Sequence, residues 1–342
     1  MRTNLLCAKC EKVSSIKHTE FTIKSVPEIL YKVYATRCSS MSPAQQTNSK
    51  NLSTPGLMPL IKSRKNCFTS FVMMLSLLIA SCCWGDKAES HLVSHQDDAT
   101  KQVEYFLQKP EGKGPWPTIV FLHGHQEEPK PGGKVFVEWG VLDQFAKRGA
   151  LAVAISQPGY GNSTGPADFC GNFTQNAISS VITKLKEEGN ISSNTLILIG
   201  ISRGALVAGL IASRDPSIAG IVLISGVYDL PKFVADKSLN PRKQECIQSL
   251  LRELLTETGS GIEALSVRSV LFFAKNIKAP ALIMNGEKDD RTDPNQARRL
   301  AEKITSYGGK ARAIIYPDCG HQIPVEMRNK EIDPFIKNIW RK

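Results

Sequence analysis

The fold of this 342-residue chain follows from the stretch Gly200-Ile201-Ser202-Arg203-Gly204. It lies between two apolar segments, residues 195–199 and residues 205–212. The first has the length and composition of a buried strand, and the second reads as a buried helix. A G-x-S-x-G sequence between a strand and a helix is typical of a nucleophile elbow, a sharp turn that exposes the serine hydroxyl. An ordinary helix N-cap at Ser202 is the simpler alternative.

Short apolar runs and helical patterns alternate outward from this stretch. Helical spacing of apolar residues occurs over 178–185 and over 297–304, and the second pattern follows Asp293 as N-cap and Pro294 in the first turn. The expected strands are residues 103–107, 118–122, 151–155, 195–199, 220–224, 281–284 and 312–316. Several are apolar at every position, as strands covered on both faces must be. The order predicts an α/β fold with a mostly parallel central sheet and helices on both faces.

Residues 231–275 interrupt this alternation. An amphipathic helical pattern that includes Cys246, Leu250 and Leu254 ends at a Gly-Ser-Gly break over 259–261. An insertion of that length between two strands predicts a small helical cap.

A serine hydroxyl needs a base to accept its proton, and the base needs an acid to orient it. His321 follows the last expected strand, and it is the only histidine after residue 125. Asp289 follows the strand before it. The order Ser202, Asp289, His321 is that of α/β-hydrolases. A histidine in an ordinary surface loop is the competing interpretation of His321.

The acid of this triad has two further candidates. Asp290 is adjacent to Asp289, and Asp229 follows the end of strand 220–224, which makes it the main rival. We favour Asp289.

Acyl transfer also needs hydrogen-bond donors for the tetrahedral oxyanion, each worth about 3 kcal/mol. One expected donor is the backbone N–H of Arg203, directly after the nucleophile. The other is the backbone N–H of His125, in the loop that follows strand 118–122. Zinc binding by His123 and His125 is a weak alternative, because no third ligand lies at a recognisable spacing. We expect neither a metal nor a cofactor.

Five ordered motifs together resemble the α/β-hydrolase superfamily, in particular the catalytic domain of the prolyl oligopeptidase and dienelactone hydrolase group. They are His123-Gly124, Gly159-Tyr160-Gly161-Asn162-Ser163, the elbow, Gly286-Glu287-Lys288-Asp289-Asp290-Arg291 and Cys319-Gly320-His321. The resemblance spans roughly residues 103–340. It implies that Ser202 is the nucleophile, His321 the general base and then acid, and Asp289 its orienting partner.

The chain also departs from these relatives. The oligopeptidases carry a large β-propeller, for which there is no room before residue 103, and dienelactone hydrolases use a cysteine nucleophile. We therefore expect a serine hydrolase that cleaves a carboxylic ester or related acyl bond in a small molecule. The alternatives are a small serine peptidase acting on short peptides, and an inactive envelope binding protein on a hydrolase scaffold.

The charge lies mainly outside this domain. Residues 1–81 contain eleven lysines and arginines but three acidic residues, so they carry +8 of the formal net charge of +11. The remaining chain is nearly balanced, and we expect no nucleic-acid partner.

The same N-terminal part contains an export-signal pattern. Basic residues at 62–65 precede an apolar run over 68–80, which is short for a membrane-spanning helix. Ile79-Ala80-Ser81-Cys82 then resembles a bacterial lipobox, with Cys82 as the lipidation candidate. An ordinary signal peptide and an uncleaved anchor are the alternatives. We expect a lipid-anchored protein of the cell envelope or periplasm.

The expected organisation is therefore a non-native or disordered leader over 1–57, an export signal over 58–82 and a linker over 83–100. The catalytic domain occupies 101–342, with the cap at about 231–275.

The isolated C-x-x-C at Cys7 and Cys10 lacks a second pair and predicts no zinc site. In an exported protein, Cys170 and Cys246 are candidates for a disulfide. Two interpretations of the Arg203 side chain stay open, contact with a substrate carboxylate and an ion pair within the scaffold.

Met58 stands where an export signal of normal length begins, so we predict that translation starts there. Intact mass or N-terminal sequencing of the native protein checks this, and a mature mass that includes residue 1 would refute it.

Overall fold

The computed structural model describes residues 88–236, 241–258 and 261–341. The chain divides into two units, residues 1–70 and 71–342, and the first lies wholly outside the described residues. The expected leader, export signal and Cys82 lie outside them as well. Within the described ranges, no helix is both long and apolar enough to cross a membrane.

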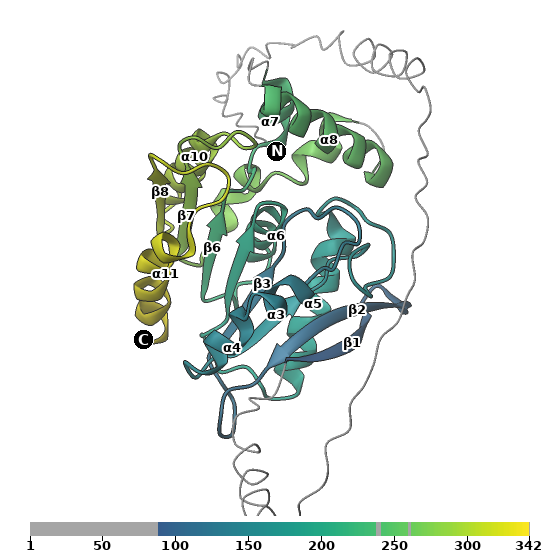
Figure 1. The fold of residues 1–342 in the computed structure, drawn as a ribbon, viewed down its shortest axis with the longest axis vertical. Coiled ribbons are helices and arrows are strands. Elements are labelled where there is room, and N and C mark those ends of the chain that lie inside the picture. Colours follow the sequence, from purple (N-terminus) through teal and green to yellow (C-terminus); the bar gives the residue numbers. More distant parts are fainter. Residues whose placement is uncertain (1–87, 237–240, 259–260, 342) are drawn as a thin grey trace, which may run out of the picture. The chain divides into compact units, whose positions relative to one another are not determined.

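The described strands form one eight-stranded sheet in the order β1-β2-β4-β3-β5-β6-β7-β8 (Figure 1). Strands β3 to β8 are parallel, and the β1–β2 hairpin joins the edge of β4 antiparallel. The strands are β1 (Glu89–His95), β2 (Asp98–Gln108), β3 (Thr118–Leu122), β4 (Leu151–Ile155), β5 (Ile197–Ile201), β6 (Gly220–Ile224), β7 (Ala281–Gly286) and β8 (Ala311–Tyr316).

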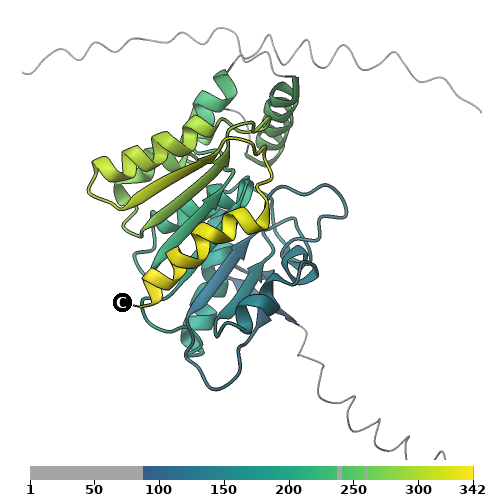
Figure 2. The same cartoon turned by 60° about the vertical axis from the view of Figure 1, so that its left-hand side comes forward.

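Helices cover both faces of this sheet, and each face has its own apolar core. One core is built by α5 (Asn172–Glu187), α6 (Arg203–Ala212), the 3-10 helix η1 (Val270–Asn276) and α10 (Pro294–Ser306). The other is built by α3 (Lys134–Glu138), α4 (Val141–Ala146) and α11 (Val325–Trp340). Figure 2 shows α11 lying across the strands. Strands β3 to β7 are apolar at nearly every position because both faces are covered. The predicted fold class is confirmed.

The linker expected over 83–100 is wrong for most of its length, because β1 and the start of β2 lie within it. The alternation of apolar and polar residues in β1 was hard to recognise, because His91 and His95 occupy two of its inward-facing positions. His95 is buried, stacks on Phe173 with 3.8 Å between ring centroids, and places Nε2 2.9 Å from the Phe173 carbonyl oxygen. Polar residues on an inward face hide a strand from a pattern based on hydrophobicity.

The elbow strand also extends further than expected. β5 continues through Gly200 and Ile201, and α6 begins at Arg203, so that Ser202 alone makes the turn. A Cβ on Gly200 would collide with the carbonyl oxygen of Gly204, and one on Gly204 would collide with that of Leu122. The absence of side chains at these two positions lets α6 approach β5 and the end of β3 closely.

The segment expected to form the cap divides into two parts. Helices α7 (Leu230–Ala235) and α8 (Pro241–Thr258) lie beyond the carboxyl ends of the parallel strands, and α9 (Ile262–Ser266) contacts α7 (Figure 1). The last part, η1, packs instead against α6 and α10, with Val270 against Gly209. The expected boundary at 275 is therefore too late, because apolar residues of η1 complete a core under the sheet.

The close packing at the elbow predicts that Gly204→Ala lowers the free energy of unfolding by about 3 kcal/mol, because a methyl group must displace backbone. Urea denaturation measures this. Gly189→Ala is the control, because its Cβ would meet no atom within 4 Å and only its φ of +70° is unfavourable. That change should cost about 1 kcal/mol. Equal losses in the two variants would contradict the steric argument.

Candidate active site

Ser202 stands at the turn between β5 and α6. Its backbone has φ 55° and ψ −117°, outside the regions that residues with side chains usually adopt. The Ser202 N–H donates to the Ile224 carbonyl at 2.7 Å, which fixes the turn against β6. Gly124, in the loop after β3, packs closely enough that a Cβ there would lie 3.2 Å from the Ser202 Cβ. Such strain persists only where the surrounding structure enforces it.

His321 and Asp289 are paired beside this turn. His321 Nδ1 lies 2.9 and 3.1 Å from the two carboxylate oxygens of Asp289. The Asp289 side chain is fully buried, and that of His321 is 10% exposed. A Cβ on Gly286 would collide with the carbonyl oxygens of Cys319 and Gly320. Because Gly286 has no side chain, the loops after β7 and β8 approach each other closely, and this brings Asp289 and His321 together.

Hydrogen bonds hold the Asp289 carboxylate in its ionised form. Burial by itself raises its pKa, but hydrogen bonds from His321 and Thr292 and the charge of His321 outweigh this and place the pKa below the ordinary value of 3.8. Thr292 Oγ1 donates to Oδ2 at 2.6 Å, and the backbone N–H groups of Arg291 and Thr292 donate to Oδ1 at 2.9 Å. The carboxylate is therefore oriented from several sides.

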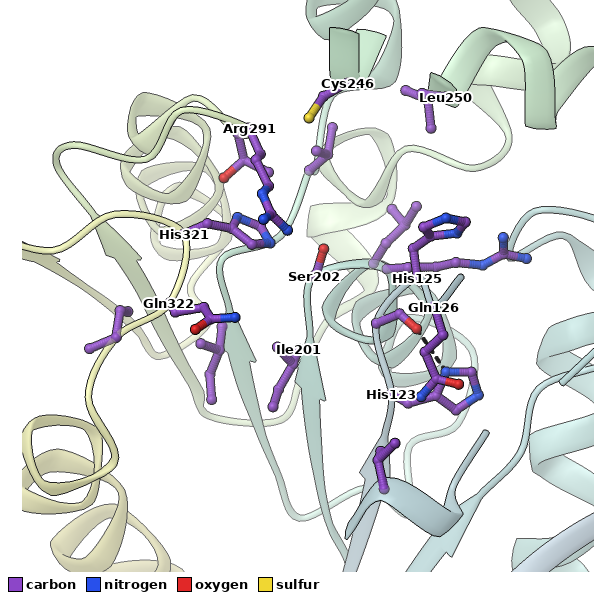
Figure 3. A pocket seen from close by; sticks show the side chains of 18 of the residues that line it. His123, His125, Gln126, Ile201, Ser202, Cys246, Leu250, Arg291, His321 and Gln322 are labelled. Atoms are coloured by element: carbon purple, nitrogen blue, oxygen red, sulfur yellow. Dashed lines mark hydrogen bonds between the residues drawn. The ribbon is translucent and has the colours of Figure 1, made fainter. Parts of the chain in front are cut away.

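Ser202 lies between His321 and His125 in the pocket (Figure 3). Within the described part of the chain, no hydrogen bond joins Ser202 and His321. Such bonds often tighten only in the substrate complex. Ser225, which the sequence analysis missed, donates from Oγ to the His321 carbonyl at 2.8 Å. Ser225 is distinguished by its positive φ of 52° just after β6, and the sequence does not reveal a backbone angle.

Asp229, the rival acid, lies elsewhere. Its carboxylate accepts a hydrogen bond from the backbone N–H of Lys232 at 3.1 Å and thereby caps α7. It also lies 3.5 Å from the Arg299 guanidinium. The structure pairs Asp289, and not Asp229, with His321.

The two expected oxyanion donors follow two neighbouring strands, β3 and β5. Arg203 is the first residue of α6, and His125 follows β3, which pairs with β5. Neither backbone N–H donates to another described residue. Both groups belong to residues that line the pocket with Ser202.

His123 has a structural role. Its Nδ1 lies 2.8 Å from the Gly124 carbonyl oxygen, and its Nε2 accepts from the Gln157 N–H at 3.1 Å. Burial lowers its pKa to about 4, so the ring is neutral near pH 7. Both ring nitrogens are occupied, which argues against a zinc site at His123 and His125. Among the described residues, no group of His, Cys, Asp and Glu is arranged to hold a metal ion.

Helix α8 supplies charged residues that the sequence analysis did not assign to the site. Glu253 Oε1 lies 2.8 Å from His125 Nδ1, and Glu253 Oε2 lies 3.5 Å from the Arg203 guanidinium. Glu257 Oε2 lies 3.2 Å from the same guanidinium. These glutamates were missed because only the folding of α8 over the elbow brings them to Arg203, about 50 positions earlier, and Glu253 to His125, which is further away still. Of the two interpretations of the Arg203 side chain, the structure supports an ion pair within the scaffold.

The pocket above Ser202 has a volume of about 850 Å³ and mostly apolar walls. Figure 3 shows Cys246 and Leu250 projecting from α8 on the side opposite Ile201. Further apolar lining residues include Phe136, Trp139, Phe169, Leu206, Leu230, Phe233, Ile323 and Val325. Charged groups, among them Arg291 and Arg328, lie at a few points of the wall.

Cys170, Cys246 and Cys319 are all free thiols. The disulfide considered between Cys170 and Cys246 is therefore wrong. Cys170 is buried beneath Arg203, with Sγ 3.7 Å from the Arg203 carbonyl oxygen. Burial raises the pKa of its thiol to about 12.

Comparisons with known proteins agree with this geometry. The model of the prolyl oligopeptidase family matches residues 171–337. The Bacillus subtilis (strain 168) protein "Uncharacterized peptidase YuxL" is 26% identical over 239 residues, which are 65% of this chain and 34% of YuxL. The chain thus spans about a third of that relative.

Two solved structures share the fold. An acylaminoacyl peptidase in complex with Z-Gly-Gly-Phe-chloromethyl ketone is 18% identical with a TM-score of 0.59, and the match covers 78% of this chain and 43% of the peptidase. The Pyrococcus furiosus esterase Pf2001 is 19% identical with a TM-score of 0.57, and the match covers 73% of this chain and 90% of the esterase.

The described residues have the α/β-hydrolase fold, with a serine at the position of the elbow. The chain is similar to the prolyl oligopeptidase family over residues 171–337, and the solved structures share its fold. The proteins that it resembles include both peptidases and an esterase.

The lowered pKa of Asp289 predicts a pH-dependent contribution to stability. The ionised carboxylate stabilises the fold fully above 3.8, and this contribution is lost as the pH falls through the lower pKa of the folded state. Asp289→Asn should therefore lower the free energy of unfolding by about 2 kcal/mol at pH 7. The difference from wild type should persist to about pH 4 and shrink at pH 3.

Urea denaturation at pH 7, 5 and 3 measures this difference, with the neighbouring Asp290→Asn as the control that should stay close to wild type. If the loss of unfolding free energy in Asp289→Asn were as large at pH 3 as at pH 7, the ionised carboxylate would not be its cause.

Proposed function

We propose that the protein hydrolyses carboxylic esters or related acyl bonds of small molecules through an acyl-enzyme on Ser202. The observation that carries the proposal is the His321–Asp289 pair beside a serine held in a nucleophile elbow. A hydroxyl at ordinary pKa is a poor nucleophile, so it needs a base of this kind.

In the proposed first step, His321 Nε2 takes the Ser202 proton as Oγ attacks the substrate carbonyl carbon. When the tetrahedral intermediate collapses, the same proton passes to the leaving group. Water then attacks the acyl-enzyme, with His321 as base, and releases the carboxylic acid and free Ser202. Asp289 keeps the proton of His321 on Nδ1, so that Nε2 faces the reacting atoms, and its negative charge stabilises the imidazolium.

The backbone N–H groups of Arg203 and His125 are the proposed donors to the oxyanion. They come from rigid positions, the start of α6 and the loop after β3, so little reorganisation is needed as charge develops. Each donor is worth about 3 kcal/mol in the transition state.

The pocket favours an apolar substrate group. Its walls carry aliphatic side chains from the sheet and α8 and aromatic side chains from α3, α7 and the segment before α5. A volume of about 850 Å³ accommodates more than an acetyl group. We infer that acyl esters of medium length are turned over faster than acetate esters. Peptide hydrolysis is the second candidate, and it is supported by the family match and by the peptidase named YuxL.

Export and lipid attachment at Cys82 are part of the proposal. They are supported by the order of basic, apolar and small residues before Cys82.

We predict that a fluorophosphonate probe labels the wild-type protein and not Ser202→Ala. Hydrolysis of p-nitrophenyl butyrate or hexanoate should fall at least 10³-fold in this variant, because the nucleophile is gone. Ser213→Ala, at the other end of α6 and away from the pocket, is the control and should keep both properties. Equal labelling of wild type and Ser202→Ala would refute the proposal.

The same esters and a panel of aminopeptidase and dipeptidase substrates separate the two candidates. Ester turnover without peptide turnover is the expected result, and efficient peptide cleavage would favour the peptidase. A lack of turnover of every substrate, with no labelling, would favour the inactive binding protein.

A further inference from the structure

The guanidinium of Arg203 is buried directly after the proposed nucleophile, with its side chain 3% exposed. It lies 4.9 Å from the ring centroid of Phe169 and 5.4 Å from that of Tyr160. Burial by itself lowers its pKa, but interactions with Cys170, Tyr160 and Glu257 raise the pKa above the ordinary value. A buried cation of this kind is stable only with paired anions, so its partners are structurally important.

Those partners lie on one face of α8. Glu253 and Glu257 are one helical turn apart, so both carboxylates reach the same guanidinium. Glu257 also accepts a hydrogen bond from the backbone N–H of Phe169. Glu245, on the same helix, is exposed and contacts Arg242 instead. The ion pairs with Arg203 therefore connect α8 to the residue that follows Ser202.

The two glutamates differ in a second contact. Glu253 Oε1 accepts from His125 Nδ1 at 2.8 Å, and Tyr160 Oη lies 3.3 Å from the same nitrogen. Among the described residues, Glu257 makes no such contact with His125. Besides Arg203, its partner is the backbone N–H of Phe169. Glu253 therefore links α8 to the loop after β3, whereas Glu257 links α8 to Arg203 and to the backbone of Phe169.

We propose that Glu253 is a positioning residue for the oxyanion donor at His125, and that Glu257 and Arg203 hold α8 over the acyl pocket. This inference rests on the proposed function of Ser202 and His125. One buried guanidinium thus couples two properties of the site: the geometry of the oxyanion loop, and the closure of the pocket wall that carries Cys246 and Leu250.

The two roles predict different kinetic signatures. Glu253→Ala should lower kcat for p-nitrophenyl butyrate about tenfold with little change in KM, because a displaced donor weakens transition-state binding. Glu257→Ala should instead raise KM several-fold with a smaller change in kcat, because a loosened α8 leaves the pocket wall incomplete. Glu245→Ala, on the exposed face of α8, is the matched control and should behave as wild type.

Conservative variants separate positioning from general damage. Glu253→Gln keeps an oxygen that accepts from His125 Nδ1, so it should recover most of the kcat lost in Glu253→Ala. Arg203→Lys should not replace Arg203, because a single ammonium group cannot serve two carboxylates in the same plane.

The decisive measurement is the inhibition constant of an alkyl trifluoromethyl ketone. Ser202 Oγ adds to the ketone carbon, the serine proton goes to His321, and the resulting hemiketal oxygen occupies the position of the oxyanion. Glu253→Ala should weaken this inhibitor by the same factor as it lowers kcat/KM, about tenfold. An unchanged inhibition constant in a folded variant would overturn the role of Glu253.

Hydrogen exchange tests the anchoring of α8 without any turnover. Amides of α8 should exchange faster in Glu257→Ala and Arg203→Lys than in wild type or Glu245→Ala. Unchanged exchange in both variants would overturn the anchoring role. If wild type fails to hydrolyse esters or react with the probe, the function proposed for Ser202 has failed, whereas faster exchange of α8 still supports its anchoring.

Discussion

The close contact of α6 with β5 and the end of β3 is the constraint on which the rest of this structure depends. No side chain fits at Gly200 or Gly204, and the chain must reverse between them within a single residue. Ser202 takes that position and its strained backbone angles. Neighbouring elements hold the turn, because the Ser202 N–H is bonded to the end of β6. The strain is thus balanced by packing on several sides, and it exposes the serine at the edge of the sheet.

The parallel sheet supplies the other reactive groups from the same edge. Strands β7 and β8 end beside each other, and Gly286 lets their following loops touch. Asp289 and His321 therefore meet although 32 positions separate them in the sequence. The hydrogen bonds around Asp289 keep its carboxylate ionised, and Ser225 fixes the backbone of His321. Together these contacts restrict His321, which lines the pocket with Ser202.

The cap is joined to this framework by ion pairs as well as by apolar contacts. A guanidinium that is almost fully buried would be unstable unless its charge were balanced, and α8 supplies two carboxylates for it. Because one of them also contacts His125, the wall of the pocket and the loop beside the nucleophile share a single network. Apolar residues of α8 also line the pocket.

The sequence by itself determined the fold class and the position of the elbow, and it predicted that Asp289 pairs with His321. Each of these depends on the local order of an apolar strand followed by a turn residue and a reactive residue. It also favoured Asp289 over Asp229, although Asp229 stayed open until the structure showed it capping α7. The strand β1 was missed because histidines occupy its inward face. Only the tertiary structure decided that Glu253 and Glu257 on α8 lie beside Arg203. It also decided that η1 packs in the core and is not part of the cap. Contacts between distant segments depend on how a helix is placed, and hydrophobic periodicity specifies which face of a helix is buried but not what it is buried against.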